Sequence, residues 1–172
     1  MRSKTRWLAL LLAAFAAILV DAGTGTSHTM RRPETHVSAR TIRAYRAQTW
    51  RWQALMGVRR TRGPRTATPV ALRFWRRHAF RALTAAAHPP HGRAWLCIHR
   101  YEGAWNDSGD PYWGGLQMDR GFMSTYAPRM LLRRGWANRW TPREQMWVAE
   151  RAYRSGRGFS AWPNTARLCG VL

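Results

Sequence analysis

The chain has 172 residues and a formal net charge of +21, from 29 basic and 8 acidic side chains. A positive field of this strength attracts polyanions, whether nucleic acids, acidic lipids or the anionic polymers of a bacterial wall, and charge alone does not choose among them. The length leaves room for one ordinary domain, or for a smaller one with a leader and an appendage, and the histidines and cysteines form no cluster at metal-ligand spacing, so we expect neither a metal nor another cofactor.

Residues 1–22 have the composition of a secretory signal peptide. Basic residues precede an unbroken apolar run from Trp7 to Val20, which is shorter than the roughly 20 residues that a membrane-spanning helix needs. We therefore expect a leader that is removed on export and a mature protein in the cell wall or the secreted fraction, without a membrane span; a leader retained as an anchor is the alternative. Residues 23–37, rich in Gly, Thr, Ser and Arg, predict a flexible tether.

Residues 38–90 predict two arginine-rich amphipathic helices. Apolar side chains recur at helical spacing within 42–56 and again within 72–86. Thr68 and Pro69 are typical of the N-cap and the first position of the second helix. This segment contains no acidic residue at all.

Three interpretations of these two helices stay open. The helices can pack on each other or on the neighbouring domain, with their arginines simply solvated. Alternatively, exposed arginines together with Trp50, Trp52 and Trp75 hold anionic wall polymer or glycan, because guanidinium groups pair with phosphate or carboxylate and indole faces stack on sugar rings. Binding to a membrane surface is the third interpretation.

The segment 94–172 differs in character, because it holds both cysteines, most of the tryptophans and most of the acidic residues. Its pattern predicts a helix from Ala94 to Tyr101, a turn-rich loop at 106–111, a short aromatic segment and then more helices. The last clear helix opens at Thr141-Pro142-Arg143-Glu144, a capping box with proline at the first helical position. We therefore expect a mainly α fold with a short irregular or β-turn segment, and we expect this part of the chain to carry the chemistry.

Export also bears on the two cysteines, Cys97 and Cys169. Thiols outside the cytoplasm usually oxidise, so a disulfide between them is the default expectation. Closing a loop of that length stabilises a fold by roughly 4 kcal/mol in the chain-entropy model.

Glu102 is the best candidate for an acid catalyst among the carboxylates of this segment. Glu144 belongs to the capping box, Glu150 has Arg154 one helical turn later as a natural partner, and the aspartates lie in turns or next to a strand. Glu102 instead ends an apolar helix among aromatic residues, which exclude water and disfavour the charged form of a carboxyl. From these residues alone, an ordinary surface residue at a helix end stays the alternative.

Two strings of this segment carry a resemblance to a known family. They are WLCIHRYEGAWNDSGDPYWGGLQM and TPREQMWVAERAYRSGRGFSAWP, followed by Cys169-Gly170. In this order they resemble the catalytic domain of the resuscitation-promoting factors and related transglycosylase-like proteins, over Trp95 to Leu172. The resemblance implies a compact, mostly helical, lysozyme-like (α+β) fold whose cleft binds a peptidoglycan glycan strand, with Glu102 protonating the glycosidic oxygen.

The resemblance also implies which residues line the cleft. A carboxamide would bond to acetamido or hydroxyl groups of the sugar, and aromatic rings would stack on it. Core packing is the alternative for the second aromatic residue of the Tyr-Trp pair, and close backbone approach is the alternative for the paired glycines. The candidate substrate-binding residues are Gln117, Tyr112, Trp113, Trp105 and Gly115.

Three positions depart from the family pattern. Gly103 stands where the family usually has serine after the glutamate, which would loosen the hydrogen bonding of the carboxylate. Tyr101 stands where many members have the first cysteine, and Cys97 lies one turn earlier on the same face. Cys169 lies later than in the family pattern, so both shifts are satisfied together if the bridge has moved by one turn.

The reaction type stays open between a muramidase and a lytic transglycosylase. Retaining and inverting hydrolases need a second carboxylate at a set distance, and none of Asp107, Asp110 and Asp119 stands out as that group. A single-acid mechanism, in which a group of the substrate replaces the second carboxylate, therefore fits slightly better. A non-catalytic protein that binds wall glycan is the alternative function, and we expect a monomer whose partner is not a nucleic acid.

Overall fold

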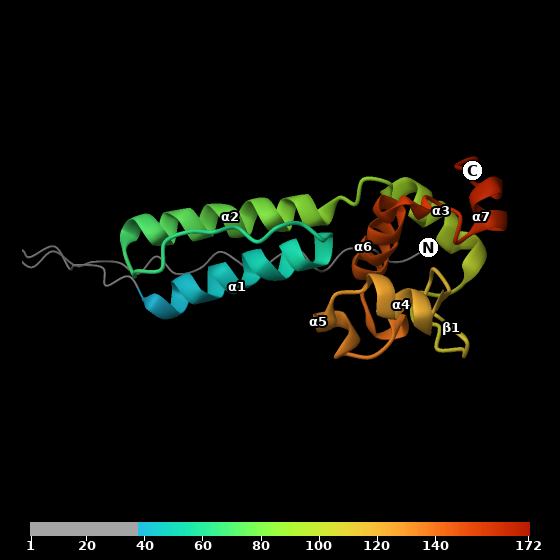
Figure 1. Cartoon of the computed structure of the whole chain (residues 1–172), viewed down its shortest axis with the longest axis horizontal. Coiled ribbons are helices and arrows are strands. Elements are labelled where there is room, and N and C mark those ends of the chain that lie inside the picture. Colours follow the sequence, from blue (N-terminus) through green and yellow to red (C-terminus); the bar gives the residue numbers. More distant parts are fainter. Residues whose placement is uncertain (1–37) are drawn as a thin grey trace, which may run out of the picture. The chain divides into compact units, whose positions relative to one another are not determined.

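The computed structural model describes residues 38–172 and shows, within them, a mainly helical protein with one small sheet (Figure 1). Helices account for 62% and strands for 3%, which confirms the mainly α class expected from the sequence. The expected leader at 1–22 and tether at 23–37 lie outside the described residues. Among residues 38–172, we find no helix with the length and apolar character needed to cross a membrane.

The two arginine-rich helices form where the sequence predicts them. Helix α1 (Ala39–Met56) begins after Ser38, whose side chain caps it, and ends at Gly57, whose φ of 67° suits glycine. Helix α2 (Pro69–Ala87) begins with a capping bond to the Thr68 hydroxyl, as the sequence predicts, and stops before a His-Pro-Pro-His run. Buried side chains of both helices form a small apolar cluster of their own.

Helices α1 and α2 run in the same direction (Figure 1). This arrangement requires the segment 57–68 to return along them in an extended form. The indole N–H of Trp50 donates to the Thr61 carbonyl at 3.0 Å, and that of Trp75 donates to the Pro64 carbonyl at 2.9 Å. The returning segment is therefore fastened to both helices.

Helix α3 (Gly92–Glu102) follows and ends at Gly103. A loop then leads to strand β1 (Tyr112–Trp113), which pairs with β2 (Met118–Asp119) as an antiparallel hairpin. Tyr112 lies opposite Asp119, and Trp113 lies opposite Met118. The turn between the strands, 114–117, is the Gly-Gly-Leu-Gln sequence that the resemblance singles out.

The rest of the chain is helical. Helix α6 (Pro142–Ala152) opens on the predicted capping box, because the Thr141 hydroxyl accepts from the Glu144 N–H while the Glu144 carboxylate accepts from the Thr141 N–H. The elements are α4 (Arg120–Tyr126), α5 (Arg129–Leu132), the 3₁₀ turn η1 (Ala137–Arg139), α6 (Pro142–Ala152), the π-type turn η2 (Tyr153–Arg157) and α7 (Pro163–Leu168).

One core cluster joins the ends of α1 and α2 to the C-terminal segment. The Trp147 indole N–H donates to the Ala86 carbonyl at 2.8 Å, and the Arg151 guanidinium donates to the Ala54 carbonyl at 2.9 Å. The two arginine-rich helices therefore pack both on each other and on the C-terminal segment, as the first interpretation proposes. Buried members of this cluster include Leu55, Met56, Ala86, Trp95, Ile98, Leu116, Val148 and Trp162.

The structure corrects one part of the interpretation in which these helices hold wall polymer or glycan. Trp75 is only 1% exposed and packs in the cluster between α1 and α2, so its indole face cannot stack on a sugar. Trp50 and Trp52 are partly exposed.

Candidate active site

Glu102 is the last residue of α3, and a hydroxyl from α7 holds its carboxylate. Thr165 Oγ1 donates a hydrogen bond to Glu102 Oε1 over 2.7 Å. The predicted disulfide is confirmed: Cys97 and Cys169 are bonded, with their Cα atoms 6.0 Å apart. Because each cysteine lies little more than one helical turn from one partner of the Glu102–Thr165 pair, the bridge keeps the two partners together.

Beside Glu102, the loop after α3 meets the Gly-Gly-Leu-Gln turn. Gln117 Nε2 donates to Asp107 Oδ2 at 2.7 Å and to the Gly114 carbonyl at 2.9 Å. A Cβ atom at Gly103 would lie 3.0 Å from Gln117 Nε2 and 3.3 Å from Asp107 Oδ2. Glu102, Asp107 and Gln117 therefore gather in one partly exposed region at the end of α3.

The close packing around Gly103 suits a residue without a side chain. A Cβ at this position would press on the Gln117 carboxamide and the Asp107 carboxylate, which would have to shift by a few tenths of an ångström. The carboxylate of Glu102 takes its hydrogen bond from Thr165 instead of from a following serine. Sequence reasoning missed Thr165, and the only signal that could have found it is its place one turn before Cys169, since the bridge brings that turn to α3.

Gln145, in the first turns of α6, ties this region to the core. Its Oε1 accepts from the Gly115 N–H at 2.9 Å, and its Nε2 donates to the carbonyls of Trp105 and Ala137 at 2.7 and 2.8 Å. The side chain is fully buried, so its bonds to the backbone hold the loop and the hairpin turn in place. The sequence gives one signal for this role, a carboxamide on a helix face that is otherwise apolar.

The paired glycines are required by close packing. A Cβ at Gly114, where φ is 73°, would lie 2.4 Å from Gln145 Oε1, and one at Gly115 would lie 2.6 Å from both His99 Nδ1 and Trp105 Cε3. Both glycines are buried, and the Gly115 N–H is already bonded within the protein. Gly115 is therefore better explained by close approach of the backbone to its neighbours than by direct contact with substrate.

The aromatic candidates fall into three environments. The Trp105 ring stacks on His99 of α3 at a centroid distance of 3.9 Å, partly exposed. Trp113 is 5% exposed and belongs to the core cluster under the Arg120 guanidinium, so the packing alternative describes it. Tyr112 is 48% exposed and presents its ring to solvent at the hairpin. Of the three, Trp105 and Tyr112 are open to a ligand.

The aspartates differ in what they can do. The Gly109 N–H, and then the Gln117 carboxamide, hold the pKa of Asp107 below its ordinary value, so Asp107 stays ionised at neutral pH. Asp110 pairs with exposed Arg120 at 3.1 Å. Asp119 caps α4 through its side chain. Asp107 is the one of these three that lies beside the end of α3.

Glu144 is held by its cap and by two cations, Arg134 and, at 3.7 Å, Arg51. Arg134 donates to its two carboxylate oxygens at 2.8 and 2.6 Å. Burial alone would raise the pKa of Glu144, but the hydrogen bonds from Arg134 and Thr141 together hold it below its ordinary value.

Glu150 is fully buried, and its predicted pairing with Arg154 is wrong. Its Oε1 accepts from the His91 N–H at 2.6 Å and from the Trp95 indole at 2.9 Å. Arg154 donates to backbone carbonyls, including that of Glu150 itself. The carboxylate thus fastens the start of α3 to α6, because both of its donors belong to that start.

Glu102 stands apart from the other glutamates within residues 38–172. Its side-chain partner is a single neutral hydroxyl, whereas Glu144 and Glu150 are each taken up by several donors. In the same part of the chain, no three His, Cys, Asp or Glu side chains lie together as a metal site would require. No family model, curated protein or solved structure matches the chain.

Proposed function

We propose that this protein cleaves the glycan strands of bacterial peptidoglycan, outside the cell, with Glu102 as the acid catalyst. One observation carries the proposal. Glu102 is a partly buried carboxyl without a cationic partner among the described residues, placed at the end of α3 beside the Asp107–Gln117 pair. The motifs that resemble the transglycosylase-like proteins supply the choice of substrate.

In the proposed reaction, Glu102 gives its proton to the glycosidic oxygen while the bond from that oxygen to the anomeric carbon breaks. Positive charge develops on the sugar ring, and a nearby ionised carboxylate stabilises it. Asp107 fits this role, because its lowered pKa keeps it charged and it adjoins Gly103. Water or the 6-hydroxyl of the same sugar then bonds to the anomeric carbon and gives its proton to the Glu102 carboxylate. Water leaves a reducing end, and the 6-hydroxyl leaves an anhydro end. Mass spectrometry of the released fragments distinguishes the two.

The Gln117 carboxamide and the exposed Tyr112 ring would meet the sugar. Gln117 Nε2 donates within the protein, so its carbonyl oxygen is the atom left to accept from an acetamido or hydroxyl group. Trp105, stacked on His99, offers a second ring surface.

The test is peptidoglycan cleavage by the full chain and by Glu102→Gln. Glutamine has almost the same shape and can still accept from Thr165, so the fold is kept while the transferable proton is lost. We expect the cleavage rate to fall by at least about a hundredfold, with the melting temperature nearly unchanged. Asp110→Asn is the matched control, since it alters an exposed carboxylate that pairs with Arg120 at the far end of the loop between α3 and β1. Normal cleavage by Glu102→Gln would show that the assignment is wrong.

A pair of variants at Thr165 tests how Glu102 is positioned. Thr165→Val removes the hydroxyl while keeping the shape, and we expect roughly tenfold slower cleavage because the carboxyl is no longer held in place. Thr165→Ser restores the donor and should restore the rate. If the protein binds cell walls but no form of it releases soluble fragments from them, the alternative of a non-catalytic glycan-binding protein is correct.

A further inference from the structure

The returning segment 57–68 builds a groove rather than a loose loop. The Gln53 carboxamide forms two hydrogen bonds with Thr61. Its Nε2 donates to the Thr61 hydroxyl at 2.7 Å, and its Oε1 accepts from the Thr61 N–H at 2.9 Å. A Cβ at Gly63 would lie 2.2 Å from the Phe74 ring, so the backbone passes directly against α2. Together with the two indole bonds, these contacts fix the path of the segment.

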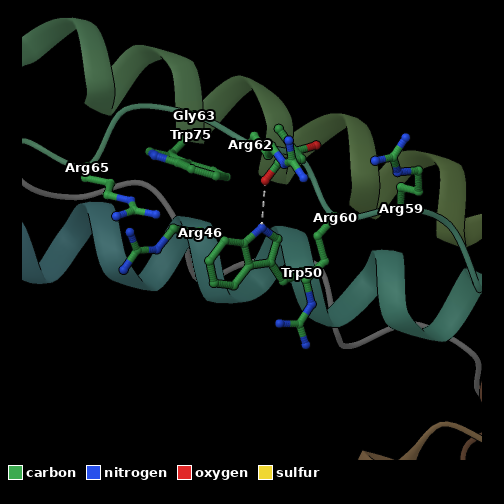
Figure 2. Close-up of a pocket in the computed structure, with 9 residues that line it drawn as sticks. Arg46, Trp50, Arg59, Arg60, Arg62, Gly63, Arg65 and Trp75 are labelled. Atoms are coloured by element: carbon green, nitrogen blue, oxygen red, sulfur yellow. Dashed lines mark hydrogen bonds between the residues drawn. The ribbon is translucent and has the colours of Figure 1, made fainter.

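Arginines line the cavity that this segment forms with α1 (Figure 2). The cavity has a volume of about 390 Å³, and a second one of about 290 Å³ shares two of its arginines, Arg46 and Arg65. Because they share these walls, the two cavities adjoin each other beside α1, and we refer to them together as the groove. Its six arginines are Arg43, Arg46, Arg59, Arg60, Arg62 and Arg65.

None of these six arginines forms an ion pair with a carboxylate of residues 38–172. The sequence explains this, since no acidic residue occurs from 35 to 101. Like charges crowded in one groove repel each other, and a bound anion reduces this repulsion. Guanidinium groups form paired hydrogen bonds with phosphate and carboxylate oxygens, which makes such anions the matching ligands.

The aromatic residues of the groove do not offer a stacking surface. The guanidinium groups of Arg46 and Arg60 already lie over the Trp50 ring, at 5.2 and 5.3 Å from its centroid. Trp75 is buried, and both indole N–H groups are bonded to backbone carbonyls. Recognition of bases or sugar faces by stacking is therefore disfavoured, and recognition of charge along a chain is favoured.

We infer that the groove formed by α1 and the segment 57–68 is a binding site for a linear polyanion without stacking bases, with phosphate or carboxylate charges at regular intervals. Six arginines line the two adjoining cavities, so a polymer engages more of them than one free anion does. This site is separate from Glu102 and its use does not depend on glycan cleavage. In a protein that acts on the cell wall, it would hold the chain to an anionic polymer there.

The experiment measures binding of the full chain to two labelled probes, an oligomer of glycerol phosphate and an oligomer of glutamate with the same number of charges. The test variant changes Arg59, Arg62 and Arg65 together to glutamine. The matched control changes three exposed arginines of α2 that do not line the groove to glutamine: Arg73, Arg76 and Arg77. Both variants lose the same net charge, so any difference between them belongs to the groove.

We expect the groove variant to bind at least about tenfold more weakly at low salt, with a log–log salt slope smaller by roughly two to three, while the control changes much less. The better of the two probes identifies the anion, phosphate or carboxylate. Equal losses in the two variants, or no binding of either oligomer, would overturn the inference. Tighter binding of a single-stranded oligodeoxynucleotide of equal charge would also overturn it, because the ligand would then be a nucleic acid. Glu102→Gln should keep full binding, so failure of the proposed catalysis and failure of this site are distinguishable.

Discussion

The region of α1, α2 and the segment 57–68 differs from the region that begins at α3 in how its charged side chains are paired. In the second region, each carboxylate has a partner within the protein, and the most buried ones accept two or more hydrogen bonds. In the first region, six arginines line a groove without a carboxylate to meet them. The comparison teaches that charge stabilises the fold in the second region, whereas in the first it is left available for a partner outside the chain.

Among the variants that test this comparison, we expect Glu150→Ala to change the free energy of unfolding most. The change leaves the His91 N–H and the Trp95 indole N–H without their acceptor in the core. Removing one side of a buried, hydrogen-bonded charge costs about 3 to 5 kcal/mol, and we expect a loss of that size in the free energy of unfolding, measured by urea denaturation. Glu150→Gln keeps one acceptor oxygen and should lose less. A loss below about 1 kcal/mol for the alanine variant would show that internal pairing of charge does not stabilise this region.

A smaller effect is expected from Arg134→Gln, which removes the nearer of the two cations beside Glu144 and leaves Arg51 at 3.7 Å from its carboxylate. Arg134 is partly exposed to solvent, so we expect a loss of only about 1 to 2 kcal/mol at neutral pH. The capping bonds to Thr141 remain in this variant.

The pH dependence of the same variant gives the sharper test. In the wild type, the pKa of Glu144 is below its ordinary value, so its contribution to stability is complete above the ordinary pKa and is lost as the pH falls through the lowered one. Without Arg134, burial is opposed by the Thr141 hydrogen bonds and the more distant Arg51 alone, so the pKa of Glu144 should be higher than in the wild type and stability should be lost at a higher pH. Unfolding curves recorded between neutral and acid pH check this, and parallel stability–pH curves for the two proteins would contradict it.

The fold follows from the sequence where local chemistry decides it. Thr68 and Pro69 start α2, and Thr141 with Glu144 starts α6, because an N-cap is a short-range hydrogen bond that the sequence shows directly. The parallel course of α1 and α2 could not be predicted. It depends on the indole bonds of Trp50 and Trp75 to a returning segment, and long-range bonds of this kind leave no periodic pattern.

In the candidate site, the sequence pointed to Glu102 but not to the residues that position it. Glu102 could be found from its apolar surroundings and by excluding other carboxylates. Thr165 and Gln145 could not be found, since their roles depend on contacts across the fold. The pairing expected for Glu150 was wrong because spacing along one helix ignores the donors that α3 brings from elsewhere.

The smallest effect is expected where the charges have no partner. Changing Arg59, Arg62 and Arg65 to glutamine removes exposed side chains that form no ion pair with residues 38–172. The free energy of unfolding should change by no more than about 0.5 kcal/mol, and at low salt it should rise rather than fall, since repulsion within the groove is reduced. Added salt screens that repulsion and should remove the difference between variant and wild type. Denaturation at two salt concentrations checks both points. A clear loss of stability at low salt would mean that these arginines hold the fold together, and the contrast between the two regions would no longer stand.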